Sequence, residues 1–322
     1  MLATIRKPIE AELARYCEIF RQTLQSDNEL LSAALKHLSR KQGKMMRPIM
    51  VLLCAREGGM ISDAVLHAAV GLELLHTSSL VHDDVVDESN MRRGQRSVNA
   101  LWDNKAAVLV GDFILSTALH EVAMTDNPAV VRRMAWLGQT LADGELEQLN
   151  ATHRNTFSEA DYYTIIGKKT AALFSSCAYV GAMLGGADEA KVKLLERYAH
   201  LTGLCFQLRD DIFDFDDTLN VGKPTGNDMQ EGKLTLPVIY ALNSSDDGYH
   251  RRLALKVRSH EASRLEVQEL VEFTIKNDGI DYAHQEMGRL RAEAQELLRS
   301  LSDVEVASSL KLFLDFVVDR QF

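Results

Sequence analysis

The stretch SLVHDDVVDE, residues 79–88, ends a long helical pattern. Apolar residues recur at helical spacing from about residue 62 onward, with no proline and one interior glycine at position 71. Asp83 and Asp87 lie one turn apart on one face of this helix, and Asp84 is rotated from them by about 100°. Carboxylates this close repel one another unless a proton or a cation joins them, and Mg²⁺ prefers such hard oxygen ligands. The pattern predicts either a magnesium site or a solvated acidic turn at a helix end.

The composition predicts a compact, helix-rich protein. The chain has 322 residues, of which 46% are hydrophobic, 25% are charged and five are proline. No shift in composition marks a boundary, so we expect a single domain over residues 1–322. The formal net charge of −10 argues against a general nucleic-acid-binding protein.

The sequence also predicts a cytoplasmic protein without a membrane span. Its first twelve residues mix charged with apolar positions, unlike a signal peptide. The best apolar run, Ala106 to Leu119, is interrupted by Asp112. The four cysteines show no CxxC spacing, as expected for buried thiols in a reducing compartment: Cys17, Cys54, Cys177 and Cys205.

The pattern along the chain is helical almost throughout. Loops are expected where glycine, proline or polar residues cluster, at residues 42–48, 89–97, 221–231 and 243–249. Helical periodicity covers residues 4–38, 49–55, 62–88, 105–125, 129–153, 159–184, 188–217 and most of the rest. No strand-period alternation of useful length is present, so the sequence predicts an all-α fold.

A second acidic cluster repeats the first. The stretch QLRDDIFD, residues 207–214, has the same D-D-x-x-D spacing, with Asp210 and Asp214 on one helical face and Asp211 beside them. The offset from Asp83 is 210 − 83 = 127 residues, too long for a local repeat. Two such helices facing each other would hold several Mg²⁺ ions, enough for a diphosphate.

Basic residues gather at helix breaks and beside both acidic clusters. Arginine binds phosphate through a planar fork and lysine binds it as a point charge. For any one of these residues, a solvated surface charge is the alternative. The candidates are Lys44, Arg47, Arg92, Arg93, Lys168, Lys169, Lys223 and Lys233.

Taken together, these motifs resemble the trans-prenyltransferase family, specifically polyprenyl diphosphate synthases of the octaprenyl type. The resemblance covers almost the whole chain and implies a helical bundle of the isoprenoid synthase type with a central cavity. Besides both acidic clusters, the motifs that carry it are Gly43-Lys44-x-x-Arg47-Pro48, Glu73-Leu74-Leu75-His76, Arg92-Arg93-Gly94, Gly111-Asp112-Phe113, Lys169-Thr170-Ala171, Gly222-Lys223-Pro224 and Gly232-Lys233-x-Thr235-x-Pro237.

The resemblance implies a Mg²⁺-dependent, head-to-tail condensation of isopentenyl diphosphate onto an allylic diphosphate such as farnesyl diphosphate. Two or three Mg²⁺ ions are expected, with Mn²⁺ as a substitute, held by Asp83, Asp87 and Asp210 and supported by Asp84, Asp211 and Asp214. The allylic diphosphate would be bound by Arg92, Lys169, Lys223 and Lys233. Isopentenyl diphosphate would be bound by Lys44, Arg47, His76 and Arg93. Thr170 and Gln207 would lie near the allylic cation.

Some positions keep two interpretations. His76 is either a substrate contact or a satisfied histidine on a buried face, and His82 is expected to be structural. Lys169 is preferred to Lys168 because it directly precedes Thr170.

Product length is expected to depend on the first acidic helix. Ser79 and Ser78 lie four and five positions before Asp83. In the family that the chain resembles, small residues there leave the product tunnel open, which points to a medium or long chain, expected to serve a respiratory quinone. A homodimer is also implied by the resemblance.

Three alternatives remain at this stage. The first is a short-chain synthase that makes farnesyl or geranylgeranyl diphosphate. The second is an HD-type phosphohydrolase, because His82-Asp83 with His76 upstream imitates its metal ligands. The third is a non-catalytic partner subunit of a heteromeric synthase.

Overall fold

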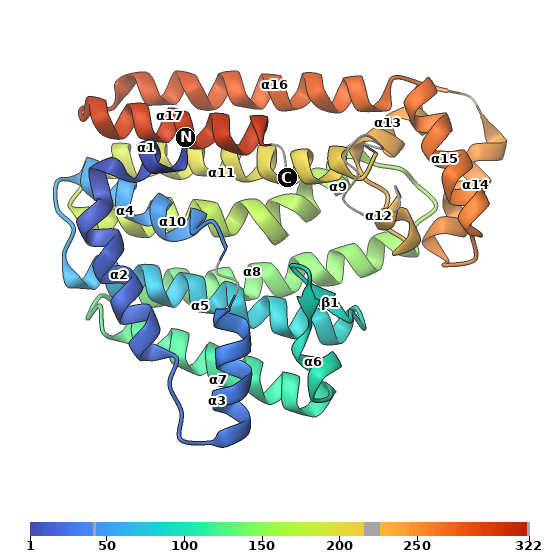
Figure 1. Cartoon of the computed structure of the whole chain (residues 1–322). Coiled ribbons are helices and arrows are strands. Elements are labelled where there is room, and N and C mark those ends of the chain that lie inside the picture. The colour runs from blue at the N-terminus through green and yellow to red at the C-terminus, as the bar shows by residue number, and fades with distance from the viewer. Residues whose placement is uncertain (41–42, 216–225, 246, 321–322) are drawn as a thin grey trace. The chain divides into compact units, whose positions relative to one another are not determined.

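The computed structural model describes residues 1–40, 43–215, 226–245 and 247–320, and helices make up nearly all of its regular structure (Figure 1). The prediction of an all-α fold is confirmed. The predicted loop at residues 89–97 contains one short antiparallel hairpin, β1 (Met91–Arg92) and β2 (Gln95–Arg96). Its two turn residues, Arg93 and Gly94, have φ angles of 52° and 70°. Positive φ at both central residues is the conformation that two-residue hairpin turns favour.

The chain divides into two compact units. Unit 1 comprises residues 1–138, 173–199 and 298–313, and unit 2 comprises residues 139–172, 200–297 and 314–322. Of the five dividing points, three fall inside α8 (Pro128–Thr152), α11 (Glu189–Phe213) and α17 (Val304–Asp319), one follows the first residue of α10 (Ala172–Gly185), and one precedes residue 298. That the whole chain acts as a single domain stays a prediction.

Unit 1 begins with four shorter helices where the sequence predicted one helical region. The break at residues 24–28 ends at Asn28, whose side chain accepts a hydrogen bond from the Leu31 amide and so caps the next helix. The elements that lie wholly in this unit are α1 (Leu2–Arg6), η1 (Lys7–Ile9), α2 (Glu10–Thr23), α3 (Glu29–Ser39), α4 (Met46–Gly58), α5 (Asp63–Val86), the hairpin, α6 (Val98–Leu101), α7 (Asn104–Ala123) and η3 (Leu298–Ser300).

The core of unit 1 is built around α4 and α5. Nearly every residue of α4 is buried, and each of its large aliphatic side chains contributes about 1.5–3 kcal/mol by leaving water. α4 also packs closely on α10 (Ala172–Gly185), because a Cβ atom at Gly185 would lie 2.3 Å from the Ala55 carbonyl oxygen. α5 packs against α4, α2 and, most extensively, α7 (Figure 1). The helix that carries the first acidic motif is therefore held by the core of unit 1.

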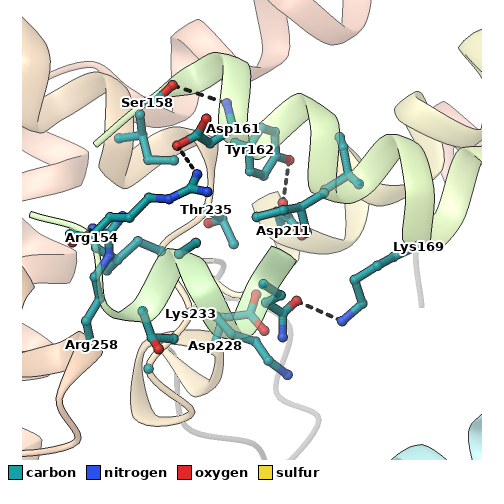
Figure 2. Close-up of a pocket in the computed structure, with 18 of the residues that line it drawn as sticks. Arg154, Ser158, Asp161, Tyr162, Lys169, Asp211, Asp228, Lys233, Thr235 and Arg258 are labelled. Carbon is teal, nitrogen blue, oxygen red and sulfur yellow. Dashed lines mark hydrogen bonds and ion pairs between the residues drawn. The ribbon is translucent and has the colours of Figure 1, made fainter. Parts of the chain in front are cut away.

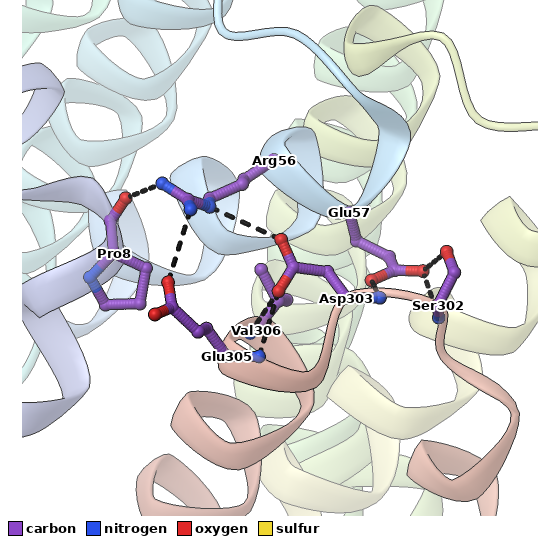
Figure 3. Close-up of polar contacts among 7 residues, drawn as sticks. All are labelled: Pro8, Arg56, Glu57, Ser302, Asp303, Glu305 and Val306. Carbon is purple, nitrogen blue, oxygen red and sulfur yellow. Dashed lines mark hydrogen bonds and ion pairs between the residues drawn. The ribbon is translucent and has the colours of Figure 1, made fainter.

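Polar contacts fix the far end of α4 (Figure 3). Arg56 donates to the Pro8 carbonyl and pairs with Asp303 and Glu305 at 3.5 and 3.3 Å. Glu57 is buried and accepts hydrogen bonds from the backbone and side chain of Ser302, at 2.9 and 2.7 Å. These contacts join α4 to the turn before α17.

Unit 2 is centred on α13 (Leu236–Ser244), which packs against α9, α15 and α16. Tyr240 of α13 stacks on Tyr282 of α16 with ring centroids 3.9 Å apart. A π-helical turn, η2 (Gly167–Ala171), interrupts the predicted helix 159–184, and such turns are frequent at functional sites. The remaining elements are α9 (Glu159–Ile166), α12 (Asn227–Gln230), α14 (Gly248–Arg258), α15 (Arg264–Lys276) and α16 (Gly279–Leu297).

Among the residues that the structure describes, two helices, α5 and α7, are long and apolar enough to cross a membrane by length and composition alone. α5 is mostly buried, as expected of a core helix, whereas α7 is less so. α7 contains the apolar run that the sequence analysis singled out.

Candidate functional site

Three arginines and a histidine from separate segments form a cationic cluster in unit 1, beside a pocket that two of the arginines line. Arg47 comes from the first turn of α4 and His76 from α5, whereas Arg92 and Arg93 come from the hairpin. The pocket has a volume of about 100 Å³, and both hairpin arginines line it together with Glu73. The structure thus brings together three of the four residues expected to bind isopentenyl diphosphate. The fourth, Lys44, has an exposed side chain just before α4.

In this cluster, positively charged side chains outnumber the negatively charged ones. Burial lowers the pKa of His76 well below its usual value, and the charges of Arg47, Arg93 and Arg92 lower it further. Burial also lowers the pKa of the Arg93 guanidinium, and Arg47 and Arg92 act in the same direction. Glu73 is the opposing carboxylate, with its Oε2 atom 3.6 Å from Arg47 Nη1. His76 is therefore neutral at physiological pH and lies among cationic groups, as in a site for an anion.

The backbone is also unusual around this pocket. Met45 and Arg93 both have left-handed backbone conformations, with φ angles of 56° and 52°. A Cβ atom at Gly43 would lie 3.3 Å from Arg93 Nη1, so the chain passes directly against the guanidinium. Backbone conformations of this kind cost energy and cluster at functional sites.

The first acidic motif presents its three aspartates differently. Asp84 is buried and accepts hydrogen bonds from Arg92, with Nε 2.8 Å and Nη2 2.6 Å from its Oδ1 atom. Burial raises the pKa of Asp84, and Arg92 opposes that shift. Asp83 is partly exposed in the last turn of α5, and Asp87 is exposed directly after it. Asp83 and Asp87 therefore face solvent while Asp84 anchors the hairpin.

Asp211 of the second acidic motif lines a pocket of about 200 Å³ in unit 2 (Figure 2). Asp211 is buried, and it accepts hydrogen bonds from the Tyr162 hydroxyl at 2.5 Å and from Gln207 Nε2 at 2.8 Å. Gln207 in turn accepts a hydrogen bond from the Thr170 hydroxyl at 2.7 Å. Burial raises the pKa of Asp211 to about 7, whereas the bonds from Tyr162 and Gln207 lower it. A continuous network joins Tyr162, Asp211, Gln207 and Thr170.

Asp214 stabilises the start of α12 in unit 2. Its two carboxylate oxygens accept hydrogen bonds from the amides of Asn227 and Asp228, at 2.9 and 3.0 Å, at the start of α12. Burial raises the pKa values of Asp214 and Asp228, and each of these carboxylates has further acidic groups nearby. Asp210, in contrast, keeps 43% of its side chain exposed and pairs with Arg320.

The lysines divide between this pocket and the surface. Lys169 lines the pocket and contacts Glu145 at 2.8 Å and Gln148 at 2.7 Å, whereas Lys168 pairs with Asp143 and does not line it. This placement favours Lys169, as the sequence analysis preferred. Lys233 also lines the pocket. Lys223 and its motif, residues 222–224, lie outside the described residues.

The two serines before the first motif differ in their surroundings. Ser78 is buried against α7 and donates a hydrogen bond to the Gly111 carbonyl at 2.9 Å. Ser79 is partly exposed and donates to the His76 carbonyl at 3.0 Å. His82 packs so closely on α7 that a Cβ atom at Gly111 would lie 2.2 Å from its Nε2 atom. The Gly111 motif is thus a place of close approach between helices.

The donor chemistry fits Mg²⁺ bound together with a diphosphate. Over the ranges that the structure describes, no group of three or more histidine, cysteine, aspartate or glutamate side chains is placed to hold an ion. Asp83, Asp87 and Asp210 nevertheless present accessible carboxylates, which are hard oxygen donors. Mg²⁺ is commonly bound by one or two carboxylates plus substrate phosphate oxygens, so a larger protein cage is not required.

Sequence reasoning assigned no role to four residues that the structure places at these sites: Glu73, Tyr162, Asp228 and Arg320. Glu73 was part of a quoted motif, but its contact with Arg47 depends on how α4 and α5 pack. Asp228 lies in a loop rich in polar residues, where one acid does not stand out. Nothing in the local pattern marks Tyr162 or Arg320.

Comparison with known proteins decides the family. A family model described as polyprenyl synthetase matches residues 28–274. The chain belongs to the polyprenyl synthetase family. It is therefore a prenyltransferase that uses isoprenyl diphosphate substrates, and the phosphohydrolase alternative is excluded.

Relatives of this prenyltransferase differ in product. The octaprenyl diphosphate synthase of Haemophilus influenzae is 33% identical over 322 residues, covering 99% of this chain and 97% of that protein. The crystal structure of geranylgeranyl pyrophosphate synthase from Bacteroides thetaiotaomicron is 43% identical, covers 99% of both chains and has a TM-score of 0.87.

A third similar protein was solved with ligands. The polyprenyl synthase from Caulobacter crescentus CB15, complexed with calcium and isoprenyl diphosphate, is 31% identical with a TM-score of 0.92. The two chains are covered to 99% and 98%, this chain first. The all-α fold is thus that of isoprenyl diphosphate synthases.

Proposed function

We propose that the chain is a medium- or long-chain, all-trans polyprenyl diphosphate synthase that extends farnesyl diphosphate or a similar primer with isopentenyl diphosphate. The observation that carries this proposal is the cationic cluster of Arg47, His76, Arg92 and Arg93, which Arg92 joins to Asp84 of the first acidic motif. A condensing enzyme has to bind two diphosphates, and a cluster of arginines beside a neutral histidine suits one of them.

Isopentenyl diphosphate binds at this cationic cluster. Arg47 and Arg93 provide planar forks for phosphate oxygens, and Lys44 adds a charge from the exposed turn before α4. The like charges of Arg47 and Arg92 beside Arg93 favour an incoming anion, which relieves their mutual repulsion. His76, being neutral, donates one ring N–H to the diphosphate without adding to the repulsion.

The allylic diphosphate is bound through both acidic motifs. Asp83, Asp87 and Asp210 would hold two or three Mg²⁺ ions, for which Mn²⁺ can substitute, and bound ions would neutralise the diphosphate and favour its departure. Basic side chains contribute to the same stabilisation of charge: Arg92, Lys169, Lys223 and Lys233. The supporting aspartates act by holding neighbouring segments: Asp84 the hairpin, Asp211 the Tyr162 network and Asp214 the start of α12.

The reaction follows from this arrangement of charge. The C–O bond of the allylic diphosphate breaks, and its electron pair leaves with the diphosphate. The hydroxyl of Thr170 and the amide of Gln207, fixed by their mutual hydrogen bond, direct oxygen dipoles toward the allylic cation. The alkene of isopentenyl diphosphate attacks C1 of the cation, and one proton is then lost to the released diphosphate. No side-chain nucleophile takes part.

Product length is set near the first motif. Both positions before Asp83 are serines, too small to stop a growing chain as an aromatic ring would. Ser78 is buried against α7, so Ser79 is the position better suited to control product length. The long product would supply the side chain of a quinone in a cytoplasmic pathway.

The active form is proposed to be a homodimer that buries one face of α7. α7 exposes apolar side chains, with 41% of Val108, 67% of Leu109 and 52% of Leu119 accessible, and Val108 and Leu119 lie on the same helical face. An apolar stripe of this kind on a helix is a typical interaction surface. A second copy of the chain offers the same stripe, so a symmetric contact would cover both.

Substitution of the metal ligands tests the proposal. We expect Asp83→Ala and Asp210→Ala each to lower turnover by at least about 100-fold, because loss of a ligand removes several kcal/mol of charge stabilisation. Asp63→Ala serves as the control, since Asp63 is an exposed aspartate at the other end of α5. Near-normal turnover of either motif variant, with the protein folded, would remove that aspartate from the metal site.

A further inference from the structure

Arg320 lies next to the second acidic motif although it comes from the end of the chain. It follows α17, and its side chain is only 13% exposed. One guanidinium nitrogen, Nη2, donates to Asp210 Oδ1 and to the Phe206 carbonyl, the latter at 3.2 Å. All of these residues belong to unit 2.

Arg320 is held in place from several directions. Its guanidinium carbon lies 4.1 Å from the ring centroid of Phe206 and 5.7 Å from that of Phe213. Its backbone carbonyl accepts hydrogen bonds from Arg209, at 3.1 Å from Nη2 and 3.4 Å from Nε. An arginine that contacts aromatic rings in this way keeps its planar fork in a fixed orientation. Several contacts fix this ion pair, which distinguishes it from an incidental surface ion pair that contributes little to stability.

The contact completes a pattern in the second motif. Asp211 is held by Tyr162 and Gln207, and Asp214 is held by the two amides at the start of α12. Asp210 is held by Arg320. Each aspartate of the motif therefore has its own partner, and that of Asp210 is a cation directly after α17.

Arg320 holds Asp210 without enclosing it. The Asp210 side chain remains 43% exposed, so its carboxylate is accessible to an ion while one oxygen is bound by the guanidinium. Metal-binding carboxylates are commonly oriented by hydrogen bonds from a second layer of residues, and loss of those partners weakens metal binding by 10- to 100-fold. A fixed carboxylate also spares the ion the entropic cost of ordering it.

We infer that Arg320 is a positioning residue of the metal site, which fixes the carboxylate of Asp210 for Mg²⁺. The inference rests on the proposed role of Asp210 as a metal ligand and adds that the residue directly after α17 completes this half of the site.

Metal affinity tests this inference without turnover. Mn²⁺ is titrated into the full-length protein in the presence of inorganic diphosphate, and free Mn²⁺ is followed by its electron paramagnetic resonance signal. We expect Arg320→Gln to weaken the Asp210-dependent Mn²⁺ binding about tenfold, because the carboxylate loses its orienting partner. Arg320→Lys, which keeps the charge but loses the planar fork, is expected to weaken it about threefold.

Two further variants make the result decisive. Arg264→Gln removes a charge from an exposed arginine of the same unit and is expected to bind Mn²⁺ as the unaltered protein does. Asp210→Asn reports the full loss of that ligand. If Asp210→Asn weakens binding while both Arg320 variants bind normally, or bind more tightly, the inference is wrong and the metal site stands. If Asp210→Asn itself has no effect, the proposed ligand assignment fails.

Discussion

His76 offers a quantitative test of the arginine pocket. In the unfolded chain its pKa is near 6.5, whereas burial and the charges of Arg47, Arg93 and Arg92 depress it well below that value in the folded protein. Below pH 6.5 the unfolded chain therefore binds a proton that the folded protein does not. Stability is lost as pH falls through this window.

The expected size follows from proton linkage. At pH 5.5, one unit below the unfolded pKa, the penalty is RT ln(1 + 10), or about 1.4 kcal/mol, provided that folded His76 stays neutral. At pH 7.5 the same expression gives less than about 0.1 kcal/mol. Glutamine at position 76 binds no proton in either state, so His76→Gln removes this contribution.

The measurement compares urea unfolding of the unaltered protein and His76→Gln at pH 7.5 and pH 5.5. We expect the difference in unfolding free energy to shift by about 1.4 kcal/mol in favour of the variant at the lower pH. Inorganic diphosphate should reduce this shift, because an anion beside His76 favours its protonated form. His153→Gln, at an exposed position, controls for the loss of a histidine. Equal pH dependence of the His76 variant and the unaltered protein would refute the account of the pocket.

Two further predictions concern product length and stability. Ser79→Tyr should shorten the dominant product by one or more isoprene units while the protein stays folded; an unchanged product pattern by chromatography would exclude Ser79 from length control. Glu57→Ala should lower the free energy of unfolding by about 3 kcal/mol, because it leaves Lys191 and the donors of Ser302 and Asp303 without their buried carboxylate. A loss below about 1 kcal/mol in urea unfolding would show that these groups find other partners.

Local patterns in the sequence were sufficient to predict part of this structure. The spacing of Asp83 and Asp87, and of Asp210 and Asp214, follows from the helical period alone, because neighbouring turns share a face. The all-α fold could also be predicted from the sequence, since apolar residues recur at helical spacing over most of the chain. The hairpin was missed because strands of two residues carry no alternation to detect.

The partners of the acidic residues were beyond that reasoning. Asp211 meets Tyr162 from 49 positions away, and Asp210 meets Arg320 from 110 positions away. Such contacts are created by the packing of whole helices, which local periodicity does not encode. The buried state of Asp84 has the same origin, because it depends on how the hairpin folds back to place Arg92.

The central claim is tested most directly by product analysis. The purified protein is incubated with farnesyl diphosphate, labelled isopentenyl diphosphate and Mg²⁺, and the dephosphorylated products are separated by chromatography. The account predicts a metal-dependent ladder that ends at one dominant chain longer than geranylgeranyl. Arrest at geranylgeranyl would contradict the proposed product length, and no incorporation by folded protein would contradict the synthase itself and favour a partner subunit.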